Sequence, residues 1–247
     1  RLLVDDEPFD VRYGELLDHR RVLDLRAGTL TRTVHWRSPS GREVEIRTVR
    51  LVSFVQRSVA AIRYEVRPRD GRPLRVVAQS ELVANEPASS RTDDPRAAYE
   101  LRNPLMAEEQ EVHQHRIVLV HRTRESGLRM AAGMDHLIEP LDGLTTGAEA
   151  APDLGRVWMT AELADGEALR FTKLLAYGWS STRSIPSVRD QVDAAVAAAR
   201  STGWDTLLAR QRAFLDEFWE HADVEIEGDD ELEQAVRFAV FHALQAG

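Results

Sequence analysis

Histidines in the middle of the chain are the first candidates for metal chemistry. His113 and His115 are two positions apart, so in a β-strand both side chains would project from one face and could share a metal ion. His121 lies too far along such a strand to join them without a bulge, and no carboxylate stands at a diagnostic spacing. We therefore expect no metal site and interpret these histidines as surface or partner-facing residues.

Carboxylates and serines supply no clearer catalytic group. Glycoside chemistry needs two carboxyl groups at a separation set by the fold, and the Asp and Glu residues offer no spacing that singles out a pair. Ser180, Ser181 and Ser184 lack the strand, elbow and helix context of a hydrolase nucleophile, and no glycine run resembles a phosphate-binding loop. The sequence therefore assigns no catalytic residue, no substrate-binding residue and no cofactor.

Tryptophans are the remaining candidates, because an indole ring can stack on a sugar. Those on expected strands and helix stripes are more often packed in a core or an interface. The five are Trp36, Trp158, Trp179, Trp204 and Trp219. We assign no sugar site to them from the sequence.

Alternating residues between positions 29 and 84 predict a meander of half-buried strands. A Ser-Pro-Ser-Gly turn interrupts the first pair, and along residues 43–48 the apolar and the charged side chains point to opposite faces. A turn rich in Arg, Asp, Gly and Pro then predicts a hairpin between strands at 60–66 and 74–82.

The second half of the expected sheet region is less regular. Residues 85–103 hold prolines, serines and paired aspartates and predict a long loop, and residues 142–152 predict a Gly/Ala/Thr-rich break. Further strands are expected near 117–121, 128–138, 157–163 and 169–175. An Asp-Gly pair at 165–166 predicts that the last two of these form a hairpin.

The hydrophobic period changes from 2 to about 3.6 after the serine-rich residues 180–187, which predicts a domain edge followed by helices. The first stripe contains Val188, Val192, Val196 and Ala199. Gly203 ends this helix. The second stripe contains Trp204, Leu208, Gln211, Leu215 and Phe218.

A third helix is expected from Asp229 and Asp230, whose carboxylates cap free amides and complement the helix dipole. One apolar face contains Leu232, Ala235, Val236, Ala239, Val240, Ala243 and Leu244. Phe238 and Phe241 make the opposite side apolar as well, so the helix should have partners on two sides. We therefore expect the natural protein to continue beyond Gly247; the alternative is a terminal helix buried between the sandwich and a second subunit.

Composition narrows the classes of function. The formal charge of −9 opposes binding to nucleic acid. The acidic stretch at 216–233 is interpreted as a solvated helix end and linker rather than a cation or partner site. No segment approaches the roughly 18 apolar residues of a membrane span. The absence of cysteine and of a secretory signal predicts a cytoplasmic protein.

Three blocks resemble glycoside hydrolase family 65, the inverting disaccharide phosphorylases. The first two, at 10–36 and 47–66, read DVRYGELLDHRRVLDLRAGTLTRTVHW and RTVRLVSFVQRSVAAIRYEV. The third, at 221–247, reads HADVEIEGDDELEQAVRFAVFHALQAG and resembles the entry into the catalytic barrel of that family. The order of the parts agrees as well: a sandwich, two linker helices and a first barrel helix.

The resemblance implies a mainly β fold, an antiparallel super-β-sandwich of the galactose-mutarotase type. Linker helices and the first helix of a truncated (α/α)6 barrel would follow. It implies a sandwich domain at 1–182, which lacks the earliest strands of the family, a helical linker at 183–221 and the start of the barrel at 222–247. Differences such as the Gly/Ala-rich residues 143–152 lie in expected loops and leave specificity open.

In function, the resemblance implies a homodimeric enzyme that phosphorolyses an α-glucosyl disaccharide such as maltose, trehalose or kojibiose. A barrel glutamic acid protonates the glycosidic oxygen, while inorganic phosphate as co-substrate attacks the anomeric carbon and yields β-glucose 1-phosphate. That acid is expected downstream of Gly247, so this piece alone should be inactive. The alternatives are a trehalose hydrolase of the same family and a stand-alone carbohydrate-binding or assembly module.

Overall fold

Strand β5 (Glu43–Val52) shows why this sequence forms sheets. In the computed structural model, which describes residues 1–85 and 104–246, Val44, Ile46 and Thr48 are buried on one face of β5. Arg47, on the other face, is exposed. The predicted division into an apolar and a polar face is confirmed for residues 43–48. Further along β5, Val49 and Leu51 are buried on the second face, in a cluster with residues such as Val188.

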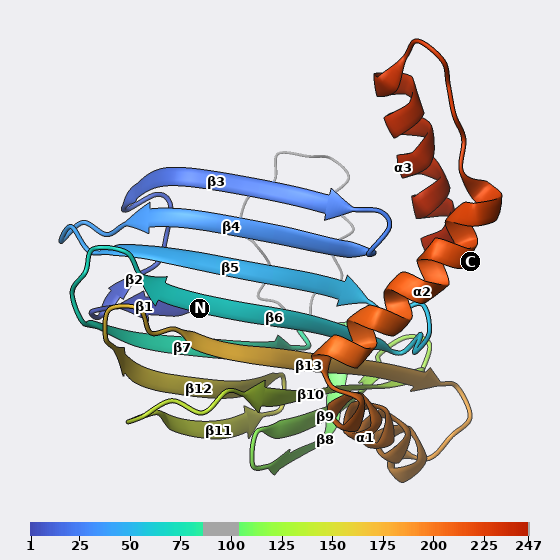
Figure 1. Ribbon diagram of the computed structural model, residues 1–247. Coiled ribbons are helices and arrows are strands. Elements are labelled where there is room, and N and C mark those ends of the chain that lie inside the picture. Colours follow the sequence, from blue (N-terminus) through green and yellow to red (C-terminus); the bar gives the residue numbers. More distant parts are fainter. Residues whose placement is uncertain (86–103, 247) are drawn as a thin grey trace, which may run out of the picture.

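Thirteen strands and three helices form within the described residues (Figure 1). The strands are β1 (Leu2–Val4), β2 (Glu7–Pro8), β3 (Glu15–Asp24), β4 (Thr29–Arg37), β5, β6 (Val59–Pro68), β7 (Leu74–Val83), β8 (Leu105–His113), β9 (Arg116–Thr123), β10 (Arg129–Ile138), β11 (Thr145–Ala151), β12 (Leu154–Leu163) and β13 (Leu169–Ser180). The helices are α1 (Ile185–Thr202), α2 (Trp204–Ala222) and α3 (Asp230–Ala246).

The strands form two stacked antiparallel sheets, which confirms the predicted sandwich. The larger sheet has the order β3-β4-β5-β6-β13-β10-β9-β8, and the smaller has the order β11-β12-β7-β1-β2. We call the face of the larger sheet that points toward the smaller sheet its inner face. The opposite face, against which α1 packs, is its outer face. Figure 1 shows α1 and α2 at one end of the strands and α3 standing beyond that end.

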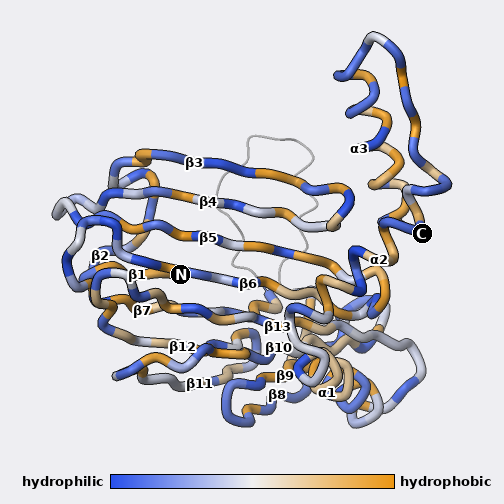
Figure 2. The backbone as a smooth tube through the Cα atoms, in the orientation of Figure 1, coloured by the Kyte–Doolittle hydropathy of each residue, from blue (hydrophilic) through white to orange (hydrophobic). Residues whose placement is uncertain are grey.

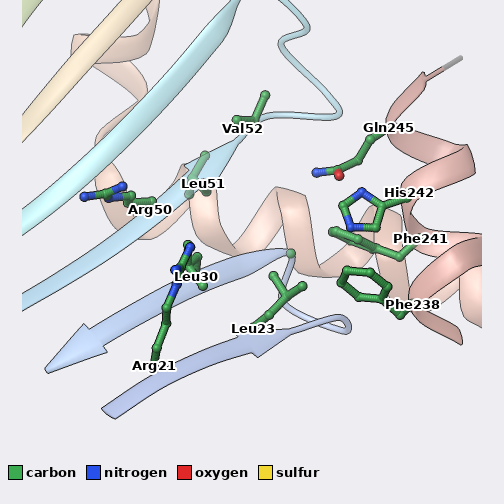
Figure 3. A pocket seen from close by; sticks show the side chains of 11 residues that line it. Arg21, Leu23, Leu30, Arg50, Leu51, Val52, Phe238, Phe241, His242 and Gln245 are labelled. Carbon is green, nitrogen blue, oxygen red and sulfur yellow. The ribbon is translucent and has the colours of Figure 1, made fainter. Parts of the chain in front are cut away.

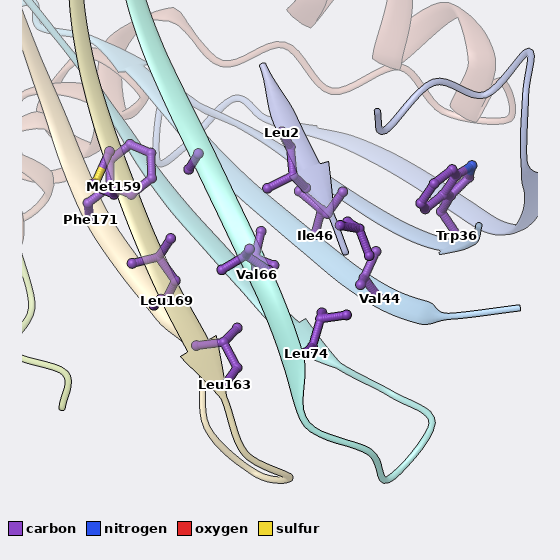
Figure 4. Close-up of a cluster of buried hydrophobic side chains, with 14 of the residues drawn as sticks. Leu2, Trp36, Val44, Ile46, Val66, Leu74, Met159, Leu163, Leu169 and Phe171 are labelled. Atoms are coloured by element: carbon purple, nitrogen blue, oxygen red, sulfur yellow. The ribbon is translucent and has the colours of Figure 1, made fainter. Parts of the chain in front are cut away.

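The main core lies between the two sheets, as Figure 4 shows. Trp36 of β4 is fully buried there, and its ring meets Phe9 edge to face with 5.3 Å between the ring centroids. Leu74 of β7 and Leu169 of β13 bring the two sheets into contact. Each such side chain contributes about 1.5–3 kcal/mol relative to an exposed one, so this layer holds the sandwich together.

Both hairpins expected across Gly-containing turns are wrong, although their strands exist. Strand β6 pairs with β5 and β13, whereas β7 pairs with β1 and β12. Likewise, β12 lies in the smaller sheet and β13 in the larger. The alternating pattern shows only that one face of a strand is buried. Strands of both sheets have this pattern, so it does not show to which sheet a strand belongs. The turns therefore cross from one sheet to the other.

Several strands were missed by the sequence analysis. Strand β11 occupies most of the region expected to be a break, β8 precedes the first strand expected after the long loop, and β1 to β3 precede residue 29. Strands β8 and β3 lie at the two edges of the larger sheet, and β11 lies at an edge of the smaller one. Edge strands carry polar and small residues and so show a weak apolar pattern. The loop predicted at 85–103 lies outside the described residues, apart from Asn85.

Helix α1 confirms its predicted stripe, because Val188, Val192, Val196 and Ala199 are all buried. The helix begins after Ser184, whose Oγ accepts a hydrogen bond from the amide of Ser187, and ends at Gly203. In α2 the buried stripe contains Trp204, Leu207, Gln211, Leu215 and Trp219, so Leu208 and Phe218 of the prediction are only half-buried.

Helix α3 begins as predicted, because Asp229 Oδ1 accepts a hydrogen bond of 2.9 Å from the amide of Leu232. Figure 2 shows polar and apolar residues alternating along it. Phe241 is buried at 2% exposure, while Leu232 and Phe238 are 49% and 47% exposed. The covered side of α3 contains Val240, Phe241 and Leu244, which come from both predicted faces. The division of this helix into the two predicted apolar faces is therefore wrong, although part of its apolar surface is left open as expected. In the described part of the chain, no helix has the length and apolar character needed to cross a bilayer.

Candidate functional site

The histidines that were considered as metal ligands do not come together. His113 ends β8 and His115 lies beyond it in the turn to β9, so the two do not share a strand face. His115 Nε2 lies 2.8 Å from Thr146 Oγ1, and the buried His121 Nε2 lies 3.0 Å from Asp153 Oδ1. Among residues 1–85 and 104–246, no group of three or more potential ligands is suited to hold a metal.

The serines near the domain edge have structural partners. Ser184 caps α1, as described above. Ser180 Oγ accepts hydrogen bonds of 3.2 and 3.1 Å from the amides of Thr182 and Arg183, which forms the turn into that helix. These serines shape the connection between β13 and α1.

The tryptophans differ sharply in exposure. Trp36, Trp204 and Trp219 are buried, and Trp219 Nε1 donates a hydrogen bond of 3.0 Å to Leu25 O. Trp158 is half-buried and packs over Gly147, where an added Cβ would lie 2.2 Å from the ring. Trp179 is 71% exposed near the end of β13. It is the most exposed tryptophan of the described residues and the best placed to contact another molecule.

The sequence analysis missed a buried polar group between the sheets. His136 of β10 is 1% exposed. Its Nδ1 lies 3.2 Å from His115 O and its Nε2 lies 2.8 Å from Ser80 Oγ. A carbonyl oxygen only accepts, so Nδ1 carries the proton and Nε2 accepts from the serine hydroxyl. Burial is the main cause that lowers the pKa of His136 to about 4. The ring is therefore a neutral bridge between the sheets.

Charges are distributed unequally on the two faces of β3 to β6. On the outer face, Arg37 lies 2.7 Å from Glu43, and Arg170 of the neighbouring β13 lies 3.2 Å from Glu65. The pairing with Arg37 holds the pKa of the Glu43 carboxyl below its usual value. This face thus carries charges of both signs, and several of them are paired.

The inner face of the same four strands carries no carboxylate at any strand position. Arg21 of β3 stands directly opposite Arg32 of β4, and Arg50 of β5 stands opposite Leu30 of β4. Arg32 Nε donates to His19 Nε2 at 3.2 Å. Arg21 and Arg50 are exposed, and neither makes an ion pair with any residue that the structure describes. Sequence spacing alone could not reveal this group, because it depends on the register of three strands.

Arg21 and Arg50 border a hollow of the described residues, which we call the α3 hollow. It has a volume of about 610 Å³ and lies between α3 and the ends of β3, β4 and β5 (Figure 3). Its lining is formed by Arg21, Leu23, Gly28, Leu30, Arg50, Leu51, Val52, Phe238, Phe241, His242 and Gln245. The hollow is therefore apolar with basic side chains at its border, and it contains no acidic residue.

The far wall of the α3 hollow is held in place by aromatic and ionic contacts. The ring of Phe241 meets Phe54 edge to face, with 6.0 Å between centroids, and Phe54 stacks on Phe214 at 5.4 Å. Arg237 Nε donates to Asp223 Oδ1 at 2.6 Å, and this pairing holds the pKa of that carboxyl below its usual range. Such a surface lacks an acid and base pair for catalysis and is suited to docking.

Comparison with known proteins agrees with this fold. The model of the family "Glycosyl hydrolase family 65, N-terminal domain" matches residues 1–218. The chain therefore belongs to glycosyl hydrolase family 65, as the sequence resemblance indicated.

Its relatives divide into two groups. Proteins from Mycobacterium tuberculosis and Mycobacterium leprae, named only as uncharacterized glycosyl hydrolases, are 54% identical over 246 residues. The α,α-trehalose phosphorylase of Thermoanaerobacter brockii is 28% identical over 249 residues. Each alignment covers all of this chain, which spans 31–32% of the length of these relatives.

A solved structure from the human microbiome, provisionally named a kojibiose phosphorylase, has the same fold. It superimposes with a TM-score of 0.85 at 17% sequence identity, over all of this chain and 31% of that one. The sandwich and its three helices therefore recur together in a second member of this architecture.

Proposed function

We propose that this chain is the non-catalytic N-terminal part of an enzyme that phosphorolyses an α-glucosyl disaccharide of the trehalose, kojibiose or maltose type. The observation that carries the proposal is the alignment of the entire chain with a trehalose phosphorylase, within an N-terminal-domain family. Inorganic phosphate would be the co-substrate, and β-glucose 1-phosphate the product of inversion.

In this proposal the catalytic acid lies outside the present chain. The α3 hollow is lined without a carboxylate, so it offers no carboxylic acid to protonate a glycosidic oxygen. The chain would instead support the catalytic barrel. Its parts would be a sandwich at 1–182, a linker at 183–221 and the start of the barrel at 222–247, which fits the last strand ending at Ser180 and α1 beginning at Ile185.

The test compares the full-length protein with residues 1–247 alone. Each is incubated with trehalose, kojibiose or maltose, with and without inorganic phosphate, and the anomeric protons of the products are followed by NMR. We expect phosphate-dependent formation of β-glucose 1-phosphate by the full-length protein only. Formation of the α-anomer would contradict inversion, and turnover by residues 1–247 would contradict the non-catalytic role.

A second candidate is a trehalose hydrolase of the same family. It is favoured by the names of the mycobacterial relatives, which refer to glycosyl hydrolases. In the same NMR experiment it would release free glucose at a rate that does not depend on phosphate.

A third candidate is a carbohydrate-binding module, favoured by the exposed Trp179 and by Tyr177, which is 50% exposed two residues earlier on the same strand face. Calorimetry with the three disaccharides tests this candidate. Micromolar binding that is lost in Trp179→Ala would support it, whereas the supporting-domain proposal expects no binding by the isolated chain.

We also propose that the parent protein is a cytoplasmic homodimer. The family resemblance supports the dimer, and the absence of cysteine fits a reducing compartment. Light scattering on the full-length protein should give twice the mass of one chain.

A further inference from the structure

We propose that the α3 hollow receives an apolar segment from the remaining chain of the parent protein, and that carboxylates on this segment pair with Arg21 and Arg50. This inference rests on the proposed function, because it requires a parent longer than the present chain. The relatives support such a parent, since this chain spans 31% of the length of the mycobacterial proteins.

The first argument is charge. The chain as a whole has a formal charge of −9, and on the outer face arginines such as Arg37 and Arg170 have carboxylates beside them. Arg21 and Arg50 stand apart, because both are exposed on an inner face that has no acidic residue. Two guanidinium groups without counter-ions beside an apolar surface favour a partner that carries negative charge.

The second argument is the apolar lining. Leu23, Phe238 and Val52 are 37%, 47% and 61% exposed around the hollow. Figure 3 shows Phe238, Phe241 and His242 of α3 facing Leu23 across the hollow. A small inorganic anion would neutralise the arginines but leave these side chains in water. An apolar protein segment would cover them and supply the charges at the same time.

The third argument is the spacing of the two arginines. They lie on β3 and β5, with Arg21 opposite Arg32 of β4 and Arg50 opposite Leu30, so they are two strands apart and offset by two residues. Their backbones are therefore about 12 Å apart. One carboxylate cannot pair closely with both guanidinium groups at that separation unless the side chains converge. Two carboxylates on one segment fit better, for example about four residues apart in an extended chain or eight in a helix.

The experiment uses the full-length protein and reverses the two charges, in the variant Arg21→Glu with Arg50→Glu. Hydrogen exchange of the α3 amides is the main readout, because a docked segment would protect this wall of the hollow. We expect protection in α3 to fall at least tenfold, since each lost charge-assisted hydrogen bond corresponds to a factor of that order. Far-UV circular dichroism confirms that the variant is folded, and Arg21→Gln with Arg50→Gln serves as a milder version.

The matched control is Arg20→Glu with Arg47→Glu. These arginines lie on the same two strands, are exposed, and project from the outer face. The control changes the net charge equally and should leave the exchange of α3 unchanged. Arg21→Lys with Arg50→Lys should retain most of the protection, because both positive charges remain. If Arg21→Glu with Arg50→Glu and the control changed the hydrogen exchange of α3 equally, the proposal would be overturned.

Other occupants give different results. A small-anion site would give two results. Inorganic phosphate or glucose 1-phosphate would stabilise the wild type but not the variant Arg21→Glu with Arg50→Glu, and this variant would leave the hydrogen exchange of α3 unchanged. If α3 protection depends on protein concentration, the occupant is a second copy of the chain. Either of these occupants would overturn the inference. A failure of the proposed reaction is distinguishable, because exchange at α3 is measured without any disaccharide.

Discussion

The buried His136 makes the stability of the sandwich dependent on pH. The unfolded chain binds a proton on this ring near its ordinary pKa of 6.5, whereas burial lowers the pKa in the folded protein to about 4. Stabilisation by the neutral ring is therefore fully present above pH 6.5 and is lost as the pH falls toward 4. The charge of Lys173 acts in the same direction as burial.

The size of the effect follows from the two pKa values. They differ by about 2.5 units, and one unit corresponds to about 1.4 kcal/mol, so about 3 kcal/mol of unfolding free energy should be lost by pH 4. That is a large share of the roughly 5–15 kcal/mol typical of a folded domain. Because carboxylates also titrate in this range, the variant His136→Asn is needed to isolate the histidine.

Urea denaturation of the wild type and of His136→Asn between pH 4.5 and 7.5 measures this contribution. Asn can keep the donor toward His115 O but cannot take up a proton. The difference in unfolding free energy between the two proteins should shrink by about 1.4 kcal/mol for each pH unit below about 6. Parallel curves, or an NMR titration of the His136 ring with a midpoint at 6 or above, would refute the reasoning.

Three further substitutions test how the helices pack on the larger sheet and how the two sheets meet at Lys173, whose Nζ donates to Glu81 O. The side-chain amide of Gln211 is buried and makes hydrogen bonds to three backbone groups. Gln211→Ala should therefore lower the unfolding free energy, measured by denaturation, by about 2–3 kcal/mol. Gln191, which is exposed, is the control, and Gln191→Ala should lower it by less than about 0.5 kcal/mol. Gly133→Ala would place a Cβ 2.7 Å from Val192 of α1 and should cost about 1–3 kcal/mol, an effect that an added Val192→Ala should partly reverse. Burial lowers the pKa of Lys173 from 10.5 to about 8, so keeping the ammonium charged destabilises the folded state at pH 7. At pH 10 the folded protein has released this proton and most of that destabilisation is gone. Any gain in stability from Lys173→Met should therefore be greater at pH 7 than at pH 10. An equal gain at both pH values would contradict that assignment.

Sequence reasoning predicted the elements that have a strong period and failed where the arrangement depends on distant partners. The two faces of β5 along residues 43–48 and the buried stripe of α1 follow from local spacing, and both are confirmed. The turn at Asp70 and Gly71 shows that the chain reverses, but it does not show which sheet the next strand joins. That choice is made by the partners of β7, which are β1 and β12.

The candidate site could not be predicted for the same reason. Arg21, Arg32 and Arg50 come from three strands, and their common face appears only when the strands are in register. His136 likewise gave no signal, because its partners Ser80 and His115 belong to strand β7 and to the turn before β9. By contrast, the family resemblance rested on contiguous blocks, which explains why it identified the architecture before the individual contacts.

Strand β13 has a consequence for how the protein is made in the cell. It is the last strand of the described sandwich in chain order, yet it lies in the middle of the larger sheet, between β6 and β10. Until it is synthesised, both neighbours present an open hydrogen-bonding edge beside apolar side chains. Nascent chains shorter than about 180 residues should therefore be held by chaperones, and translation pauses should be harmful before this strand and tolerated after it.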